Sequence, residues 1–83
     1  MVYNVVYKAS VQKDLARLDK PVARRILNKI DAELGATADS CPALKGEFAG
    51  LRKFRVGDHR VVFVILGNEV QVLRIGDRKE VYR

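Results

Sequence analysis

The sequence predicts an α+β domain with the order β-α-α-β-β-β, in which an αα-hairpin packs on a mostly antiparallel four-stranded sheet. Three observations predict it: a first segment rich in Val and Tyr, two stretches with apolar residues at helical spacing, and three strand-like runs separated by glycine-containing turns. With 83 residues, the chain is expected to form a single domain, residues 1–83.

The first strand and the first helix are expected within the first twenty residues. Residues 2–7 are free of Gly and Pro and rich in Val and Tyr, which favours a strand. Ser10 is expected to act as the N-cap of a helix that begins at Val11. In that helix Val11, Leu15 and Leu18 fall on one side, which should face the sheet.

The second helix is expected to begin at Pro21 and to end at Gly35. Its apolar side carries Val22, Ala23, Ile26, Leu27, Ile30 and Leu34. Its other side carries Arg24, Arg25, Asn28 and Lys29. Such residues are usually the solvated face of an amphipathic helix, so they are not expected to bind a ligand directly.

A connection and three strands complete the chain. Residues 35–50 contain Gly, Ala, Thr, Asp and Ser and predict a loop, which Leu44 and Phe48 would anchor to the core. Strands are expected at 51–56, 60–66 and 70–75, separated by Gly57-Asp58 and Gly67-Asn68, which tolerate positive φ in tight reversals. Consecutive antiparallel hairpins follow, with helices on one face of the sheet and the other face open to a ligand.

Positive charge is concentrated in the C-terminal part of the chain. Residues 51–83 contain eight basic and four acidic residues, so they contribute +4 of the total net charge of +6. Clustered positive charge attracts polyanions, which makes nucleic acid the leading partner class and an anionic membrane surface a weaker one. Charge alone leaves open a third interpretation, a basic face that is merely solvated.

The composition argues against several kinds of protein. The longest apolar run, residues 61–66, is far shorter than the ~20 residues that span a bilayer, and the N-terminus lacks the features of a signal peptide. We therefore expect a cytoplasmic protein with no membrane association. Cys41 is the only cysteine and His59 the only histidine, so neither a disulfide nor a metal site is expected, and no cofactor.

Neither of these two residues is expected to be catalytic. Cys41 has no activating base nearby in the sequence, which favours a structural thiol over a nucleophile. His59 flanks a tight turn beside Asp58, where a hydrogen-bonding role at the surface is expected. One histidine also cannot supply both the general acid and the general base of a reaction.

Alternation along the strand at 51–56 places Lys53 and Arg55 on one face, about 7 Å apart at ~3.3 Å per residue, and Arg52 on the other face. Arg60 opens the next strand just across the turn. If Arg60 faces the same way, three cations meet on one patch, and their repulsion is relieved when an anion lies between them. The alternative is that all three face water, where the repulsion is largely screened.

The last residues extend this cationic set. Arg78 follows Gly76, and Tyr82 could stack on a base or donate its hydroxyl to a phosphate. The alternative is an ordinary strand aromatic, with Arg78 as a turn residue paired with Glu80. Further RNA contacts are expected from Lys45, Arg52, Lys79 and Arg83.

The element order and three segments together resemble the RelE toxins of toxin–antitoxin modules. These segments are LKG at 44–46, LRKFRVGDHRVVF at 51–63 and VLRIGDRKEVY at 72–82. The resemblance covers essentially the whole chain. The motif positions of the RelE branch correspond here to Lys53, Arg55, Arg60, Arg78 and Tyr82.

The resemblance implies an mRNA interferase that enters the ribosomal A site, contacts mRNA and rRNA there, and cuts the message. The ribose 2′-hydroxyl would attack the adjacent phosphate, giving a 2′,3′-cyclic phosphate and a free 5′-hydroxyl without a metal ion. A cognate, RelB-like antitoxin would neutralise the toxin. This sequence departs from the family pattern at two positions: the family has a lysine where Arg55 stands and often a tyrosine where His59 stands. The first difference leaves open which residue accepts the proton.

The five motif residues can share the chemistry. Lys53 is the better candidate base, since an arginine is effectively always protonated. Arg55 and Arg60 would hold the scissile phosphate. Arg78 would lie near the leaving 5′-oxygen, and Tyr82 would position the nucleotide.

Two other functions remain open at this point. The ParE branch resembles the same fold but acts on DNA gyrase and generally lacks the complete basic and tyrosine set, so the set favours a ribonuclease. A module that binds RNA without cutting it would use the same cations as phosphate contacts and Tyr82 as a stacking platform.

Overall fold

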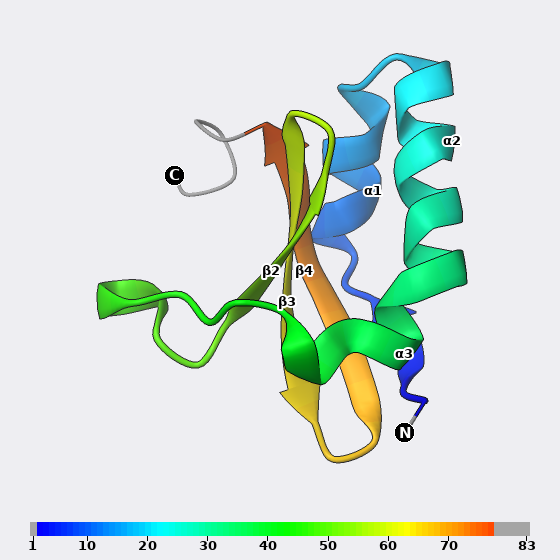
Figure 1. Cartoon of the computed structure of the whole chain (residues 1–83). Helices are drawn as coiled ribbons and strands as arrows, with labels where there is room; N and C mark the ends of the chain where they lie inside the picture. The colour runs from blue at the N-terminus through cyan, green and yellow to red at the C-terminus, as the bar shows by residue number, and fades with distance from the viewer. Residues whose placement is uncertain (1, 78–83) are drawn as a thin grey trace.

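The computed structural model describes residues 2–77, in which four strands form one sheet with helices on one of its faces (Figure 1). This confirms the predicted fold class. The elements are β1 (Asn4–Tyr7), α1 (Ser10–Ala16), α2 (Lys20–Lys29), the π-helical turn η1 (Ile30–Leu34), α3 (Gly35–Thr37), the 3-10 turns η2 (Ala38–Ser40) and η3 (Gly46–Phe48), β2 (Arg52–Val56), β3 (His59–Leu66) and β4 (Glu69–Asp77).

The strands lie in the order β1-β4-β3-β2. β2, β3 and β4 pair antiparallel as consecutive hairpins, whereas β1 pairs parallel with β4, with Asn4 opposite Glu69. Gly57 and Gly67 have φ values of 58° and 64° in the two hairpin turns, a region that glycine enters without steric cost. The predicted turn positions are therefore confirmed.

The hydrophobic core lies between the helices and one face of the sheet. Phe63 of β3 is fully buried in it, as are Val61 on the same strand and Val70 and Val72 on β4. The helices contribute Val11, Ile26, Ile30 and Leu34. No helix in the described residues is long and apolar enough to cross a membrane.

The prediction that the second helix ends at Gly35 is wrong, because helical structure continues to Thr37. α2, η1 and α3 follow one another without interruption from Lys20 to Thr37, because the buried stripe continues through Ile30 and Leu34 to Ala38. Apolar residues spaced by four drift about 40° around a helix of 3.6 residues per turn. The π-helical turn holds more residues per turn, which keeps this stripe facing the sheet.

Gly35 lies inside the helical segment, where the N-terminal segment passes close to its backbone. Its φ of −57° is helical, and its carbonyl accepts a hydrogen bond of 2.8 Å from the N–H of Tyr3. A Cβ at this position would lie 3.1 Å from the Tyr3 carbonyl oxygen. The glycine therefore allows the N-terminal segment to cross close over the helix.

The connection between α3 and β2 is more ordered than the predicted loop. It contains the turns η2 and η3, and its middle pairs with β2: the N–H of Leu44 donates to the Leu51 carbonyl at 2.9 Å, and that of Lys53 donates to the Pro42 carbonyl at 3.1 Å. Leu44 and Phe48 are half-buried. Backbone pairing thus holds this segment to the sheet edge.

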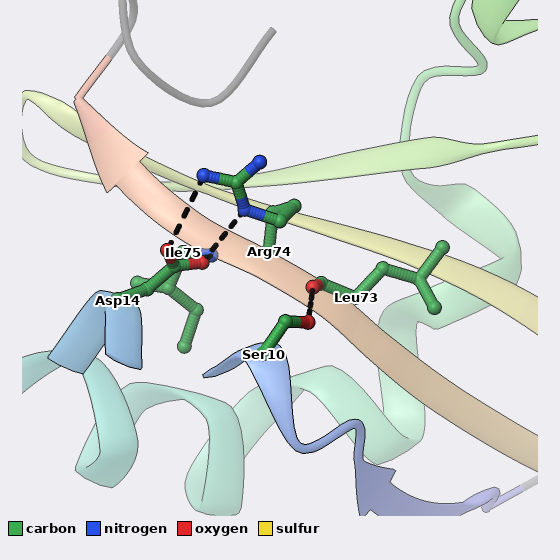
Figure 2. A network of polar contacts seen from close by, with 5 residues as sticks. All are labelled: Ser10, Asp14, Leu73, Arg74 and Ile75. Carbon is green, nitrogen blue, oxygen red and sulfur yellow. Dashed lines mark hydrogen bonds and ion pairs between the residues drawn. The ribbon is translucent and has the colours of Figure 1, made fainter. Parts of the chain in front are cut away.

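Ser10 does not cap the first helix. Ala9 occupies the N-cap position without a side-chain hydrogen bond, whereas Ser10 Oγ donates to the Leu73 carbonyl of β4 at 2.9 Å (Figure 2). β1 pairs with β4 only as far as Val72. Ser10 therefore joins α1 to the part of β4 that β1 no longer covers.

Asp14, one helical turn after Ser10, makes the second polar contact between α1 and β4. Its Oδ2 accepts hydrogen bonds of 2.9 Å from the Ile75 N–H and from Arg74 Nε, and its Oδ1 accepts one of 3.3 Å from Arg74 Nη2 (Figure 2). Asp14 is 7% exposed and is the only buried charged residue in the described part of the chain. A buried carboxylate requires this pairing, because desolvation disfavours its charge.

We predict that Asp14→Ala lowers the free energy of unfolding by about 2–4 kcal/mol, because it removes the acceptor of the buried Ile75 N–H and the ion pair with Arg74. Urea denaturation of the purified protein measures this. The exposed Lys29–Glu33 ion pair is the control: Glu33→Ala should change stability by no more than about 0.5 kcal/mol. Equal losses in the two variants would contradict the assignment.

Candidate functional site

The face of the sheet opposite the helices carries the candidate site. Phe54 and Val56 of β2 point toward the helices, where Val56 is buried and Phe54 packs against the core. Side chains alternate along a strand, so Lys53 and Arg55 project from the other, open face. The predicted division of β2 into two faces is thus what the structure has.

The strand register brings Arg60 to the same place. Arg60 of β3 is the direct partner of Arg55, and the Cβ atoms of such cross-strand pairs lie about 4.5–5.5 Å apart on one face of the sheet. On the other side of Arg60 lies Gly76 of β4, which has no side chain. We call Lys53, Arg55 and Arg60 the open-face patch.

The open-face patch contains unneutralised positive charge. Among the side chains that the structure describes, none of its three cations forms an ion pair. Arg55 Nε donates to the Gly57 carbonyl at 3.2 Å, which keeps this side chain at the turn, and Lys53 and Arg60 are half-buried. Like charges directly opposite one another on a sheet are destabilising. An anion bound between them would relieve the repulsion.

An apolar side chain lies beside the patch. Val62 is only 3% exposed although it projects from the open face, and it is not part of the core cluster under the helices. Its cross-strand partners are Lys53 on β2 and Arg74 on β4. Long cationic side chains can bury their aliphatic stems while the charged head remains in water. The patch therefore has an apolar base and a charged rim.

A fourth cation, Arg74, is close to the patch but already compensated. The register places it across Val62 from Lys53, and its guanidinium binds the carboxylate of Asp14. Sequence reasoning missed Asp14. The signal available was its position: it lies three residues after Val11 on the apolar side of a short helix, where a carboxylate needs a partner.

Two predicted RNA contacts occupy other places. Arg52 projects toward the helices, and its Nη1 donates to the Cys41 carbonyl at 2.8 Å and the Asp39 carbonyl at 3.2 Å, which ties β2 to the end of the second helix. Lys45 is exposed in the segment before η3. Neither belongs to the open-face patch.

The remaining predicted site residues follow the end of β4. Arg78, Lys79, Tyr82 and Arg83 lie outside the described residues. β4 ends at Asp77, one residue after the glycine that pairs with Arg60. Their roles stay predictions.

His59 is separated from the patch. Its partners across the sheet are Val56 and Asp77, and alternation along β3 turns it to the helix side, opposite to Arg60. Within residues 2–77, no three His, Cys, Asp or Glu side chains gather in a way that could hold a metal ion.

Cys41 is a buried thiol at the end of the second helix. Its Sγ donates to the Thr37 carbonyl at 3.4 Å. Burial raises the pKa of the Cys41 thiol; the nearby Arg52 opposes this shift and Asp39 adds to it. Burial and the charge of Asp31 likewise raise the pKa of Tyr7 on β1. In the sheet, β4 and β3 separate β1, with Tyr7, from β2.

We predict that Cys41 reacts with a thiol reagent more slowly than free cysteine at neutral pH, because a raised pKa lowers the thiolate fraction. Folding favours the protonated thiol, so this contribution to stability is complete below the ordinary pKa of 9.0 and is lost as the pH rises through the higher folded value. Urea midpoints between pH 7 and 10.5 test this against Cys41→Ser. A steeper decline in the variant than in the wild type would contradict it.

Comparison with known proteins identifies the family. The family model of the ParE toxin of the type II toxin–antitoxin system parDE matches residues 5–82. The chain belongs to the ParE toxin family. This places the toxin in the superfamily that includes RelE and makes it the toxin of a type II toxin–antitoxin system. No curated protein matches the toxin significantly in sequence.

Solved structures share the toxin's fold. A chain in the RelBE2 toxin–antitoxin complex of Mycobacterium tuberculosis is 22% identical, with a TM-score of 0.85 over 94% of this chain and 100% of that chain. A chain of the chromosomal ParDE system of P. aeruginosa is 19% identical, with a TM-score of 0.73 over 92% of this chain and 96% of that chain. A chain of the archaeal RelE–RelB complex of Pyrococcus horikoshii is 26% identical, with a TM-score of 0.66 over 96% of this chain and 99% of that chain.

The neighbours include both RelE and ParE systems at comparable identity. A shared fold does not imply a shared target, so the fold alone does not distinguish a ribonuclease from a toxin with another target. The chemistry of the open-face patch has to make that distinction.

Proposed function

We propose that this toxin is a metal-independent endoribonuclease that cuts mRNA in the ribosomal A site. The observation that supports it best is the pairing of Arg55 with Arg60 beside Lys53, which collects three cations on the open face of the sheet. A toxin that cuts mRNA on the ribosome would act in the cytoplasm.

The open-face patch suits a phosphodiester in its transition state. Attack on phosphorus adds negative charge to the nonbridging oxygens, and donors fixed before the reaction stabilise that charge most effectively. Arg55 and Arg60 are held side by side by the strand register, and a guanidinium offers the fork of donors that matches a phosphate. These two residues would bind the scissile phosphate.

The reaction would form one bond to phosphorus and break another. The ribose 2′-oxygen attacks the adjacent phosphorus, Lys53 accepts the 2′ proton as general base, and the bond to the 5′-oxygen breaks. The products are a 2′,3′-cyclic phosphate and a 5′-hydroxyl, whose oxygen takes a proton from solvent water as it leaves. Arg78 would stabilise that oxygen, and Tyr82 would position the nucleotide.

The shape of the site suggests what the ribosome contributes. The open-face patch lies on the surface of a sheet, and its residues are exposed or half-buried. Alignment of the 2′-oxygen, phosphorus and leaving oxygen in one line can supply much of a rate enhancement. The A site would provide this alignment by holding the message, and the toxin would add the charged groups.

An inhibitor of DNA gyrase is the second candidate function. It is favoured by the match to the ParE family model and by the likeness to the ParDE system of P. aeruginosa. In that case the open-face patch would bind protein or DNA. Binding of RNA without cleavage is a third possibility, which would leave the message intact.

We predict that Arg60→Ala slows mRNA cleavage by about 2–4 kcal/mol of transition-state stabilisation, or roughly 30- to 1,000-fold, because it removes one fixed donor from the phosphate site. Primer extension on a defined message with translating ribosomes measures this. Lys13→Ala on α1 removes one charge away from the patch and should retain activity.

The outcomes of this experiment separate the candidate functions. Cuts within A-site codons that weaken in Arg60→Ala support the ribonuclease. Full activity in Arg60→Ala contradicts the site assignment. A folded toxin that leaves the message intact but inhibits supercoiling by gyrase favours the second function, and cuts in free RNA would show that the ribosome is not required.

The toxin's partner is proposed to be a RelB-like antitoxin with an acidic segment that covers the open-face patch. The RelBE2 and RelE–RelB neighbours are themselves toxin–antitoxin complexes. An acidic segment that is disordered alone could fold along the toxin and neutralise its charge. This would block access of RNA to the site.

We predict that binding of the antitoxin encoded beside the toxin weakens as NaCl rises from 50 to about 500 mM, since exposed charge pairs are screened. Lys53→Ala should reduce this salt dependence, and Lys13→Ala should reduce it less. Calorimetric titrations at several salt concentrations measure both. A salt dependence that is the same in wild type and Lys53→Ala would place the acidic contact elsewhere.

A further inference from the structure

The end of β4 is held by a helix rather than by a neighbouring strand. β1 stops pairing with β4 at Val72, whose carbonyl accepts a hydrogen bond of 2.9 Å from the Lys8 N–H. Beyond that point α1 runs beside β4, and Ser10 and Asp14 supply the hydrogen bonds that a strand would otherwise make (Figure 2). These contacts cover an exposed edge, a recurrent need of sheets.

The held segment contains a β-bulge. Phe63 is opposite Val72 and Val62 is opposite Arg74, so Leu73 is an extra residue on β4. Bulges bend a strand and redirect the side chains that follow. Ser10 binds the carbonyl of this extra residue, and Asp14 binds the backbone two residues later. Together they fix the direction in which β4 leaves the bulge.

The direction of β4 matters to the open-face patch. Gly76 comes directly after the residue whose N–H is bound by Asp14, and it is the cross-strand partner of Arg60. Arg60 is in turn the partner of Arg55. A displacement of β4 at Ile75 would therefore reach the phosphate-binding pair through a single cross-strand contact.

The contact with Arg74 adds an electrostatic effect. Arg74 projects from the strand one position before Ile75, and Asp14 neutralises it with two hydrogen bonds. Arg74 lies across Val62 from Lys53. Asp14 thus places a negative charge beside this neighbour of the patch as well as holding the strand.

We propose that Asp14 is a positioning residue of the ribonuclease: from the helical layer, it fixes the bulged end of β4 so that Arg60 is aligned with Arg55. This inference rests on the proposed function. Asp14 does not reach the open face itself, so its effect should appear in the rate of cleavage at saturating ribosomes and much less in KM.

The test compares three variants of the whole toxin. Asp14→Ala removes the acceptor, whereas Asp14→Asn keeps a carbonyl that can still accept the Ile75 N–H. Val11→Ala is the matched control, because it removes a buried apolar contact of the same helix and leaves the hydrogen bonds of Ser10 and Asp14 to β4 in place. Urea denaturation curves of the three variants are used to choose an assay temperature at which all of them are folded.

We expect Asp14→Ala to cleave about 10- to 100-fold more slowly at saturating ribosomes, with KM changed less than about threefold, since small misplacements of reacting groups are costly. Asp14→Asn should recover most of the rate, and Val11→Ala should lie within about twofold of wild type. Cleavage by Asp14→Ala at the rate of Val11→Ala overturns the inference.

Amide hydrogen exchange and NMR shifts provide a readout that does not depend on activity. In Asp14→Ala, the Ile75 amide should exchange at least about tenfold faster, and the amide signals of Arg60 and Gly76 should move, whereas Val11→Ala leaves them in place. Unchanged signals overturn the inference. If the wild type does not cleave RNA, the proposed function fails, and the exchange data alone decide whether Asp14 positions β4.

Discussion

In the described residues the helices cover only one face of the sheet, and the other features follow from this constraint. A small domain buries a limited share of its surface, so its apolar side chains must gather in one layer. Here they do so between α1, α2 and the inner face of β2, β3 and β4. Within the described residues, α1 and α2 leave the opposite face uncovered (Figure 1). The unpaired cations of the open-face patch lie there, exposed or half-buried.

The prediction of this arrangement from sequence succeeded where the information is local. Alternation in β2 divides Lys53 and Arg55 from Phe54 and Val56, and a two-residue turn at Gly57 fixes the register that pairs Arg55 with Arg60. These rules act over a few residues. They were sufficient to give the order of the strands along the chain, both hairpins and the face of β2 on which Lys53 and Arg55 lie.

The errors concern residues whose partners are distant in the sequence. Ser10 has the chemistry of a helix cap, but its hydroxyl binds a carbonyl 63 residues away. Asp14 drew no prediction, and its carboxylate binds the backbone 61 residues away. Gly35 was predicted to end a helix, but it lies within helical structure, where its backbone is close to Tyr3. In each case tertiary contact overrides local preference, and no local pattern announces the partner.

The parallel pairing of β1 with β4 delays completion of the sheet during synthesis of the toxin. β1 is synthesised first, but its partner is the last of the four strands to be made, and β4 lies between β1 and β3. The sheet thus lacks an inner strand, and Arg60 lacks one of its neighbours, until residues 69–77 have left the ribosome. Pairing across such a sequence distance is slow compared with local hairpin formation. A newly made toxin would therefore pass through an interval without its assembled surface, during which an antitoxin already present could bind it.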